Sequence, residues 1–106
     1  MEHFMRMIVF YDLPTVTPKE RKIHSAFRKF LLKDGFDMLQ WSVYARIVNG
    51  IAGVNTHMSR IRKVLPAIGS VRCLVVTEKQ YSEIVILVGD PKKQENKINS
   101  SQLLLF

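Results

Sequence analysis

Asp12 is the residue of this sequence that is best placed to do chemistry. It directly follows an apolar run, Met7–Tyr11, and Pro14 comes soon after it. The run shows no polar alternation, which predicts a strand buried on both faces. Pro14 cannot continue an interior ladder, so the strand should end near Asp12. A carboxylate at the carboxyl end of a strand stands where ligands bind in open α/β sheets, although an aspartate there can also simply support a turn.

The chemistry that suits Asp12 is the binding of a divalent cation. Mg²⁺ is usually held by one or two carboxylates together with water and substrate phosphates. No second acidic residue is expected at a comparable strand end near Asp12: Glu20 is placed to cap a helix, and four others belong to other predicted elements, namely Asp34, Asp37, Glu78 and Glu83. A two-fold symmetric dimer would bring Asp12 next to its symmetry mate. Metal-assisted phosphodiester cleavage, if it occurs, is therefore expected to need two copies of the chain.

Other catalytic chemistries lack their motifs in this sequence. There is no GxGxxG and no P-loop, which excludes nucleotide binding of those kinds, and no nucleophile elbow. His3, His24 and His57 lack metal-ligand spacing, and we interpret them as surface or cap residues. The single cysteine, Cys73, cannot form an intrachain disulfide and lies in an apolar run, which predicts a small core residue.

Charge and length limit the class of protein. The 106 residues predict one domain, and 16 lysines and arginines against 9 acidic residues give a net charge of +7. A basic surface favours nucleic acid, acidic lipid or an acidic partner, while a solvated basic face is the alternative. No apolar segment approaches the roughly 20 residues that span a bilayer, and no signal peptide is recognisable. We expect a cytoplasmic protein that does not bind membranes.

The elements that position Asp12 follow from spacing and cap signals. The first strand is expected over about Met5–Asp12. Thr17-Pro18-Lys19-Glu20 predicts a capping box that opens a helix, which Gly35 ends. Residues 36–48 are rich in strand formers, but their apolar positions change phase near 39–41. That change predicts one kinked strand or two short strands.

The second half of the chain repeats this alternation of elements. A helix is expected over Ile51–Leu65 and a buried strand over Val71–Val76. Residues 77–80 are interpreted as a connection, and Glu83–Val88 as a further strand. Two helices on one face of a four- or five-stranded sheet make an α/β sandwich.

The C-terminal residues differ in composition from this core. Residues 1–89 are expected to form the domain, and 90–102 a polar linker with too few apolar residues for a core. The chain then ends on four apolar residues, which are expected to dock as an added strand on a sheet edge, either the chain's own or a partner's. They are Leu103, Leu104, Leu105 and Phe106.

Four segments in register resemble the small CRISPR-associated nuclease that partners the CRISPR integrase in spacer acquisition. They are residues 7–14, 27–36, 39–44 and 76–81. None of the four motifs is specific alone, but their order and spacing match over about residues 5–89. The similarity is greatest to the members found with type II systems.

The resemblance implies an α+β, ferredoxin-like βαββαβ sandwich, with two helices on one face of an antiparallel sheet. It also implies a homodimer in which the C-terminal strand of each chain pairs with the sheet of the other. Asp12 matches the metal-binding, catalytic aspartate of the family, so Mg²⁺ would be shared between the two Asp12 residues. The resemblance further implies cleavage of single-stranded RNA or double-stranded DNA, and a place between two integrase dimers where the protein supports prespacer DNA.

Three functional hypotheses follow. The chain is a metal-dependent endonuclease, a non-catalytic scaffold that bridges integrase dimers on DNA, or a toxin-like endoribonuclease of the same fold that cleaves messenger RNA. In each of them, lysines and arginines should contact phosphate. The candidates are Arg6, Arg21, Arg28, Lys29 and Arg46.

Overall fold

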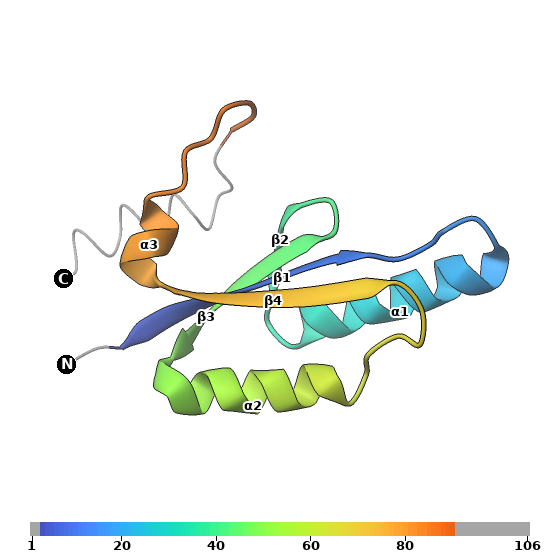
Figure 1. The fold of residues 1–106 in the computed structure, drawn as a ribbon, viewed down its shortest axis with the longest axis horizontal. Coiled ribbons are helices and arrows are strands. Elements are labelled where there is room, and N and C mark those ends of the chain that lie inside the picture. The colour runs from blue at the N-terminus through green and yellow to red at the C-terminus, as the bar shows by residue number, and fades with distance from the viewer. Residues whose placement is uncertain (1–2, 91–106) are drawn as a thin grey trace.

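A four-stranded antiparallel sheet organises the computed structural model, which describes residues 3–90 (Figure 1). The strands lie in the order β2-β3-β1-β4, so β1 is central. The elements are β1 (Phe4–Asp12), α1 (Pro18–Lys33), β2 (Asp37–Gln40), β3 (Val43–Asn49), α2 (Gly50–Arg62), β4 (Ser70–Thr77) and α3 (Glu78–Ser82). Up to β4 this is the βαββαβ order that was predicted. The linker beyond Asp90 and the docking strand Leu103–Phe106 lie outside the described residues.

The capping signals at the start of α1 are confirmed. The Thr17 hydroxyl accepts a hydrogen bond from the Glu20 backbone N–H at 3.1 Å, and the Glu20 carboxylate accepts from the Thr17 N–H at 2.9 Å. The helix runs to Lys33, and Gly35 follows with a φ of +91°. Glycine favours this left-handed conformation, so the helix ends where the sequence predicts.

The change of apolar phase near 39–41 marks the boundary between two short strands. β2 and β3 are joined by a turn at Trp41 and Ser42, and the register shifts between Met38 and Gln40. Ser42 has a φ of +65°, which is uncommon for a residue with a side chain. The Tyr11 N–H donates to the Ser42 carbonyl at 3.1 Å. The turn is thereby held against the end of β1.

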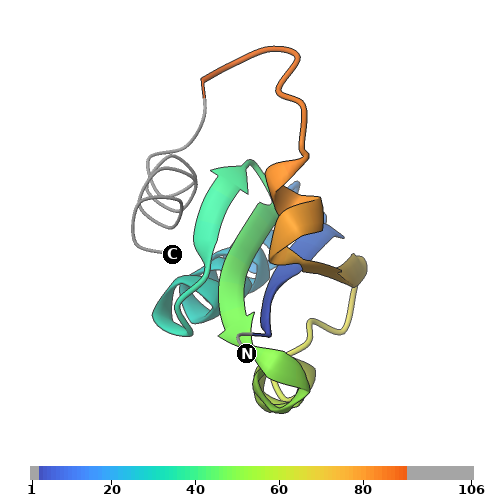
Figure 2. The same cartoon turned by 90° about the vertical axis from the view of Figure 1, so that its left-hand side faces the viewer.

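Helices α1 and α2 cover one face of the sheet (Figures 1 and 2). The odd-numbered residues of β1 point to this face and form the core with apolar residues of both helices. The main members are Met7, Val9, Tyr11, Phe27, Leu31, Tyr44, Val54 and Ile61. Cys73 packs against this cluster, and burial raises the pKa of its thiol, as expected for a small apolar residue.

Neither α1 nor α2 covers the other face, which we call the open face. Residues opposite each other in antiparallel strands point to the same side, so the β1 residues Arg6, Ile8 and Phe10 share this face with their partners on β3 and β4. The apolar members are Ile8, Phe10, Val43, Ala45, Ile47, Leu74 and Val76. Phe10 and Leu74 are 37% and 52% exposed. A solvent-facing side of a sheet is normally polar, and this one is not.

The structure corrects three predictions about the helices and strands: one helix end and two element types. α2 spans Gly50–Arg62, because Pro66 restricts the residue before it and the helix stops earlier than Leu65. Residues 77–80 are not a connection: Thr77 caps α3 through a second capping box with Gln80. Glu83–Val88 is not a strand, because its backbone is paired with no strand within the described residues.

No helix within residues 3–90 is long and apolar enough to span a membrane.

Candidate functional site

Asp12 is the last residue of β1, as predicted, and it is exposed. It lies opposite Ser70 of β4 and has the same parity as Phe10, so it belongs to the open face. It lines an open depression of about 370 Å³. The other residues around this depression are Phe10, Tyr11, Trp41, Ser42, Val43, Ser70 and Arg72.

The backbone around Asp12 is closely packed although its side chain is exposed. Gly69 has a φ of +82°, and a Cβ atom at this position would lie 2.6 Å from the Asp12 carbonyl oxygen. Only glycine allows β4 to begin this close to the end of β1. Leu13 is buried and fixes the chain immediately after Asp12. The carboxylate is therefore presented from a rigid backbone.

Within residues 3–90, the chain supplies a single carboxylate to this position. No three His, Cys, Asp or Glu side chains within residues 3–90 are close enough together to hold a metal ion. The side chain of Asp12 makes no hydrogen bond to another described residue. Its carboxylate is a hard oxygen ligand of the kind that Mg²⁺ prefers. In proteins this ion usually keeps several waters and binds one or two carboxylates. A single carboxylate of this kind fits Mg²⁺ where water, phosphate or a further carboxylate completes the ligands.

Arg6 is not available for phosphate, contrary to the prediction. It is 2% exposed, and its Nε and Nη2 donate to the two carboxylate oxygens of Glu78 at 2.7 and 3.0 Å. Its guanidinium lies 4.0 Å from the centre of the Tyr81 ring. The residue ties α3 to β1 instead.

Arg46 is likewise engaged inside the chain. Its Nη1 donates to the backbone carbonyl of Asp34, and its Nε donates to the carbonyl of Ile47 at 3.1 Å. The carboxylate of Asp34 lies between two further side chains: its Oδ2 is 2.8 Å from His57 Nδ1, and its Oδ1 is 2.9 Å from Arg60 Nη1. Burial would raise the pKa of Asp34, but the hydrogen bonds and charges of His57 and Arg60 together lower it. This cluster joins α1 to α2 and β3.

The remaining predicted phosphate contacts lie on α1. Arg21 is exposed, and its Nη1 donates to the carbonyls of Thr15 and Val16 at 3.3 and 2.7 Å. Arg28 is half-buried, and its buried Nε has no hydrogen-bond partner within the described chain. Lys29 is exposed, and its side chain makes no hydrogen bond or ion pair within residues 3–90. Arg28 and Lys29 therefore remain the freest of the five candidates.

Trp41, which lines the depression with Asp12, was not predicted to belong to the site, and neither was His24 behind it. Trp41 is 66% exposed, and its ring stacks on His24 with centroids 5.2 Å apart and planes 18° from parallel. His24 is buried, so the interpretation of this histidine as a surface or cap residue is wrong. The sequence signal was a tryptophan at a point where the strand pattern changes phase, since a turn exposes its residues.

Tyr11 connects this pair to the core. Its ring makes edge contacts with His24 at 5.7 Å and with Phe27 at 5.1 Å, and it stacks on Tyr44 at 6.0 Å. Burial, followed by the neighbouring Tyr44, raises the pKa of the Tyr11 phenol. The phenol therefore stays protonated at neutral pH. Tyr11 serves as a structural neighbour of Asp12 and not as a base.

Comparison with known proteins gives a consistent result over most of the chain. The family model "CRISPR associated protein Cas2" matches residues 5–84. The chain is 52% identical over 102 residues to the "CRISPR-associated endoribonuclease Cas2" of Acidovorax ebreus, which covers 96% of this chain and 100% of that protein. Proteins of the same description from Parvibaculum lavamentivorans and Campylobacter jejuni are 46% and 40% identical. The match covers 96% and 99% of this chain, and 100% and 73% of those proteins.

A solved structure supports the fold independently. The chain superposes on a structure described as "Crystal structure of cas2" with a TM-score of 0.59 and 22% sequence identity. The match covers 85% of this chain and 92% of that one. The predicted ferredoxin-like α+β architecture is therefore confirmed.

Proposed function

This chain belongs to the CRISPR-associated Cas2 family, and we propose that it is a homodimeric, Mg²⁺-dependent endonuclease whose site is assembled from Asp12 of both subunits. The observation that supports this proposal is the position of Asp12 on the apolar open face. A second copy that covers this face would bring a second Asp12 toward the first. The relatives are described as endoribonucleases, so we propose RNA as substrate, with DNA as the alternative.

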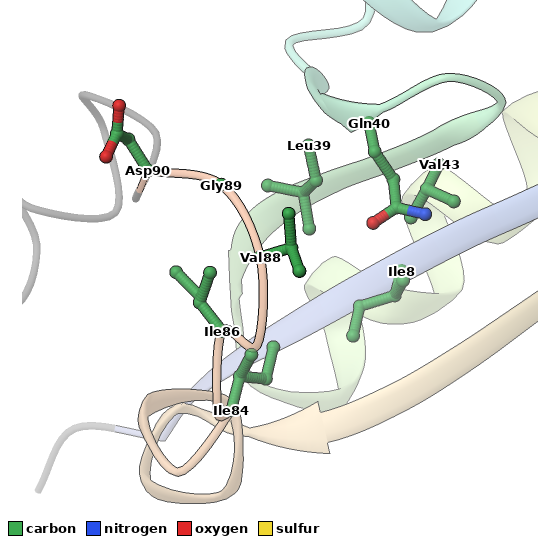
Figure 3. Close-up of a pocket in the computed structure, with 9 residues that line it drawn as sticks. All are labelled: Ile8, Leu39, Gln40, Val43, Ile84, Ile86, Val88, Gly89 and Asp90. Carbon is green, nitrogen blue, oxygen red and sulfur yellow. The ribbon is translucent and has the colours of Figure 1, made fainter.

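Residues 3–90 cover the open face only incompletely. Residues 84–90 arch over it, and a cavity of about 410 Å³ separates Ile84, Ile86 and Val88 from the sheet residues Ile8, Leu39 and Val43 (Figure 3). Residues 84–88 are five consecutive apolar residues, and all of them remain exposed. Exposed apolar surface of this extent is typical of interaction sites. We infer that a second copy covers the open face and that residues 84–88 pair with a free sheet edge.

Each residue of the proposed site has a defined part in binding. Asp12 from each subunit would hold the cation, and Arg72 beside it would neutralise phosphate charge. Mg²⁺ bound there would supply charge stabilisation to the phosphodiester. Phe10 and Val43 form an apolar floor that limits water around the phosphate. Gly69 and Leu13 keep the backbone of Asp12 in place.

A charge placed on the open face should separate the subunits. Leu74→Asp would bury two unpaired carboxylates, one from each copy, and we expect dimer affinity to fall by about 100-fold or more. Sedimentation velocity measures the change in mass. Cleavage in Mg²⁺ should disappear together with the dimer, although Asp12 itself is unchanged.

Ile51→Asp is the matched control for Leu74→Asp. Ile51 is 65% exposed in the first turn of α2, on the helix layer and away from the open face. This variant should remain dimeric and active, because a carboxylate is favourable near a helix N-terminus. A wild-type chain that sediments as a monomer while cleaving nucleic acid would refute the shared site.

We further propose that the dimer bridges two CRISPR integrase dimers on prespacer DNA during spacer acquisition. The support is the family membership together with the charge of α1. Five of its basic residues are exposed, against one acidic residue in the helix: Lys19, Arg21, Lys22, Lys29 and Lys33. Two copies joined through their open faces would each direct such a helix outward. The resulting dimer would present a basic surface on both sides.

DNA binding by α1 should depend steeply on salt, because each neutralised phosphate releases counterions. Lys29→Gln should reduce the slope of log K against log salt by about 1. Fluorescence anisotropy over a salt series with the integrase complex measures this slope. Lys63→Gln removes an exposed lysine from the end of α2 and should leave the slope unchanged. Equal slopes for all three proteins would exclude Lys29 as a phosphate contact.

A further inference from the structure

We propose that Trp41, supported by His24, is a platform on which an unpaired nucleobase stacks while the adjoining phosphate lies at Asp12. This inference rests on the proposed endonuclease function, and it adds a contact with a base to the contacts with phosphate. The features that carry it are an exposed indole, a buried ring that supports it, and a depression shared with Asp12.

The indole is fixed although it is exposed. One of its faces rests on His24, which is 7% exposed and held in turn by the edge contact with Tyr11. The turn that carries Trp41 is bonded to β1 through Ser42 and Tyr11. The tryptophan is 66% exposed, so no residue within 3–90 covers the side of the ring away from His24. A large, ordered, exposed aromatic ring has little value for stability, and its natural use is recognition.

The position of Trp41 links this ring to the phosphate chemistry. Trp41 and Asp12 line the same depression, and Arg72 lies there as well, opposite Phe10 in the β-ladder. A volume of about 370 Å³ is within the usual range of small-ligand sites. Arg28 follows His24 by one helical turn on the same side of α1, with its Nε unpartnered within the described chain. Aromatic and cationic groups thus surround one carboxylate.

This combination favours an unpaired base over other occupants. Single-stranded nucleic acids bind where aromatic side chains alternate with positive charge, since every base has a π-face. Bases within a duplex are already stacked on their neighbours and do not offer a free face. An acidic peptide would use the cations but would have no requirement for the indole. The net charge of +7 also suits a polyanion.

Trp41 is the only tryptophan of the chain, so its fluorescence reports directly on the platform. The full chain would be titrated in EDTA with a 12-nucleotide single-stranded RNA, an abasic strand of equal length and a 12-base-pair duplex. We expect the single strand to quench the fluorescence and the other two to bind with little quenching. Trp41→Ala should weaken single-strand binding by about 10-fold, and Trp41→Phe by much less.

Failure of the stacking proposal and failure of the endonuclease proposal would give different results. Equal quenching by the abasic strand, or unchanged RNA affinity of Trp41→Ala, would overturn the platform whatever the chain cleaves. Asp12→Asn should keep the quenching while losing cleavage in Mg²⁺. If the wild type binds and quenches as expected but never cleaves, the endonuclease proposal fails while stacking at Trp41 stands. Far-UV circular dichroism of each variant checks that the fold is intact.

Discussion

Asp12→Asn should lower Mg²⁺-dependent cleavage by about 100-fold or more, because a cation at a phosphodiester supplies several kcal/mol of charge stabilisation. Asparagine keeps the size of the side chain and one oxygen, but it removes the negative charge from both subunits at once. Asp12 is exposed and without a side-chain hydrogen bond in the described structure, so the free energy of unfolding should hardly change. The measurement is cleavage of labelled single-stranded RNA, and of double-stranded DNA, by rigorously purified protein.

Asp37→Asn provides the matched control for this experiment. Asp37 is also an exposed aspartate on a strand, but it begins β2 and does not line the depression at Asp12. Its variant should cleave as the wild type does. Equal rates for wild type, Asp12→Asn and Asp37→Asn would mean that a contaminating nuclease is responsible. The bridging role in spacer acquisition would then be the remaining function.

Arg6→Ala should lower the free energy of unfolding by about 3–5 kcal/mol, the usual cost of removing one partner of a buried ion pair. Glu78 is 17% exposed and would be left without the two bonds from Arg6. The contact of the guanidinium with the Tyr81 ring would be lost as well. Urea unfolding followed by circular dichroism measures this loss. It should be accompanied by release of α3 from the sheet.

Two comparisons make the test of Arg6 specific. Arg60→Ala breaks an ion pair of similar length, 2.9 Å to Asp34, but the arginine is 53% exposed and the cost should be about 0–1 kcal/mol. The double variant Arg6→Met with Glu78→Leu replaces both charges with apolar groups and should recover most of the stability. If Arg6→Ala costs no more than Arg60→Ala, the Arg6–Glu78 pair does not anchor α3.

The sequence was informative where structure depends on neighbouring residues. The end of the apolar run at Asp12, the capping box at Thr17 and Glu20, and the change of phase near 39–41 each reflect a local rule, and all three are confirmed. The predicted burial of this run on both faces is wrong, because Phe10 is 37% exposed, and the strand predicted as buried over residues 71–76 has no fully buried residue. The same reasoning missed the capping box at Thr77, and it made a strand of Glu83–Val88 because strand propensity does not reveal whether a partner strand is present. The family resemblance, carried by four segments in register, is confirmed by the family match over residues 5–84.

The sequence by itself therefore determined the order of the elements up to β4, the family and the place of Asp12 at the end of β1. Only the tertiary structure decided which charges are free. Arg6 and Glu78 lie 72 positions apart, and no local pattern shows that they meet and remove Arg6 from the basic surface. The stacking of Trp41 on His24 and the exposure of the apolar open face are equally non-local. Packing between distant segments sets desolvation, and desolvation decides whether a charge or a ring is structural or free to bind.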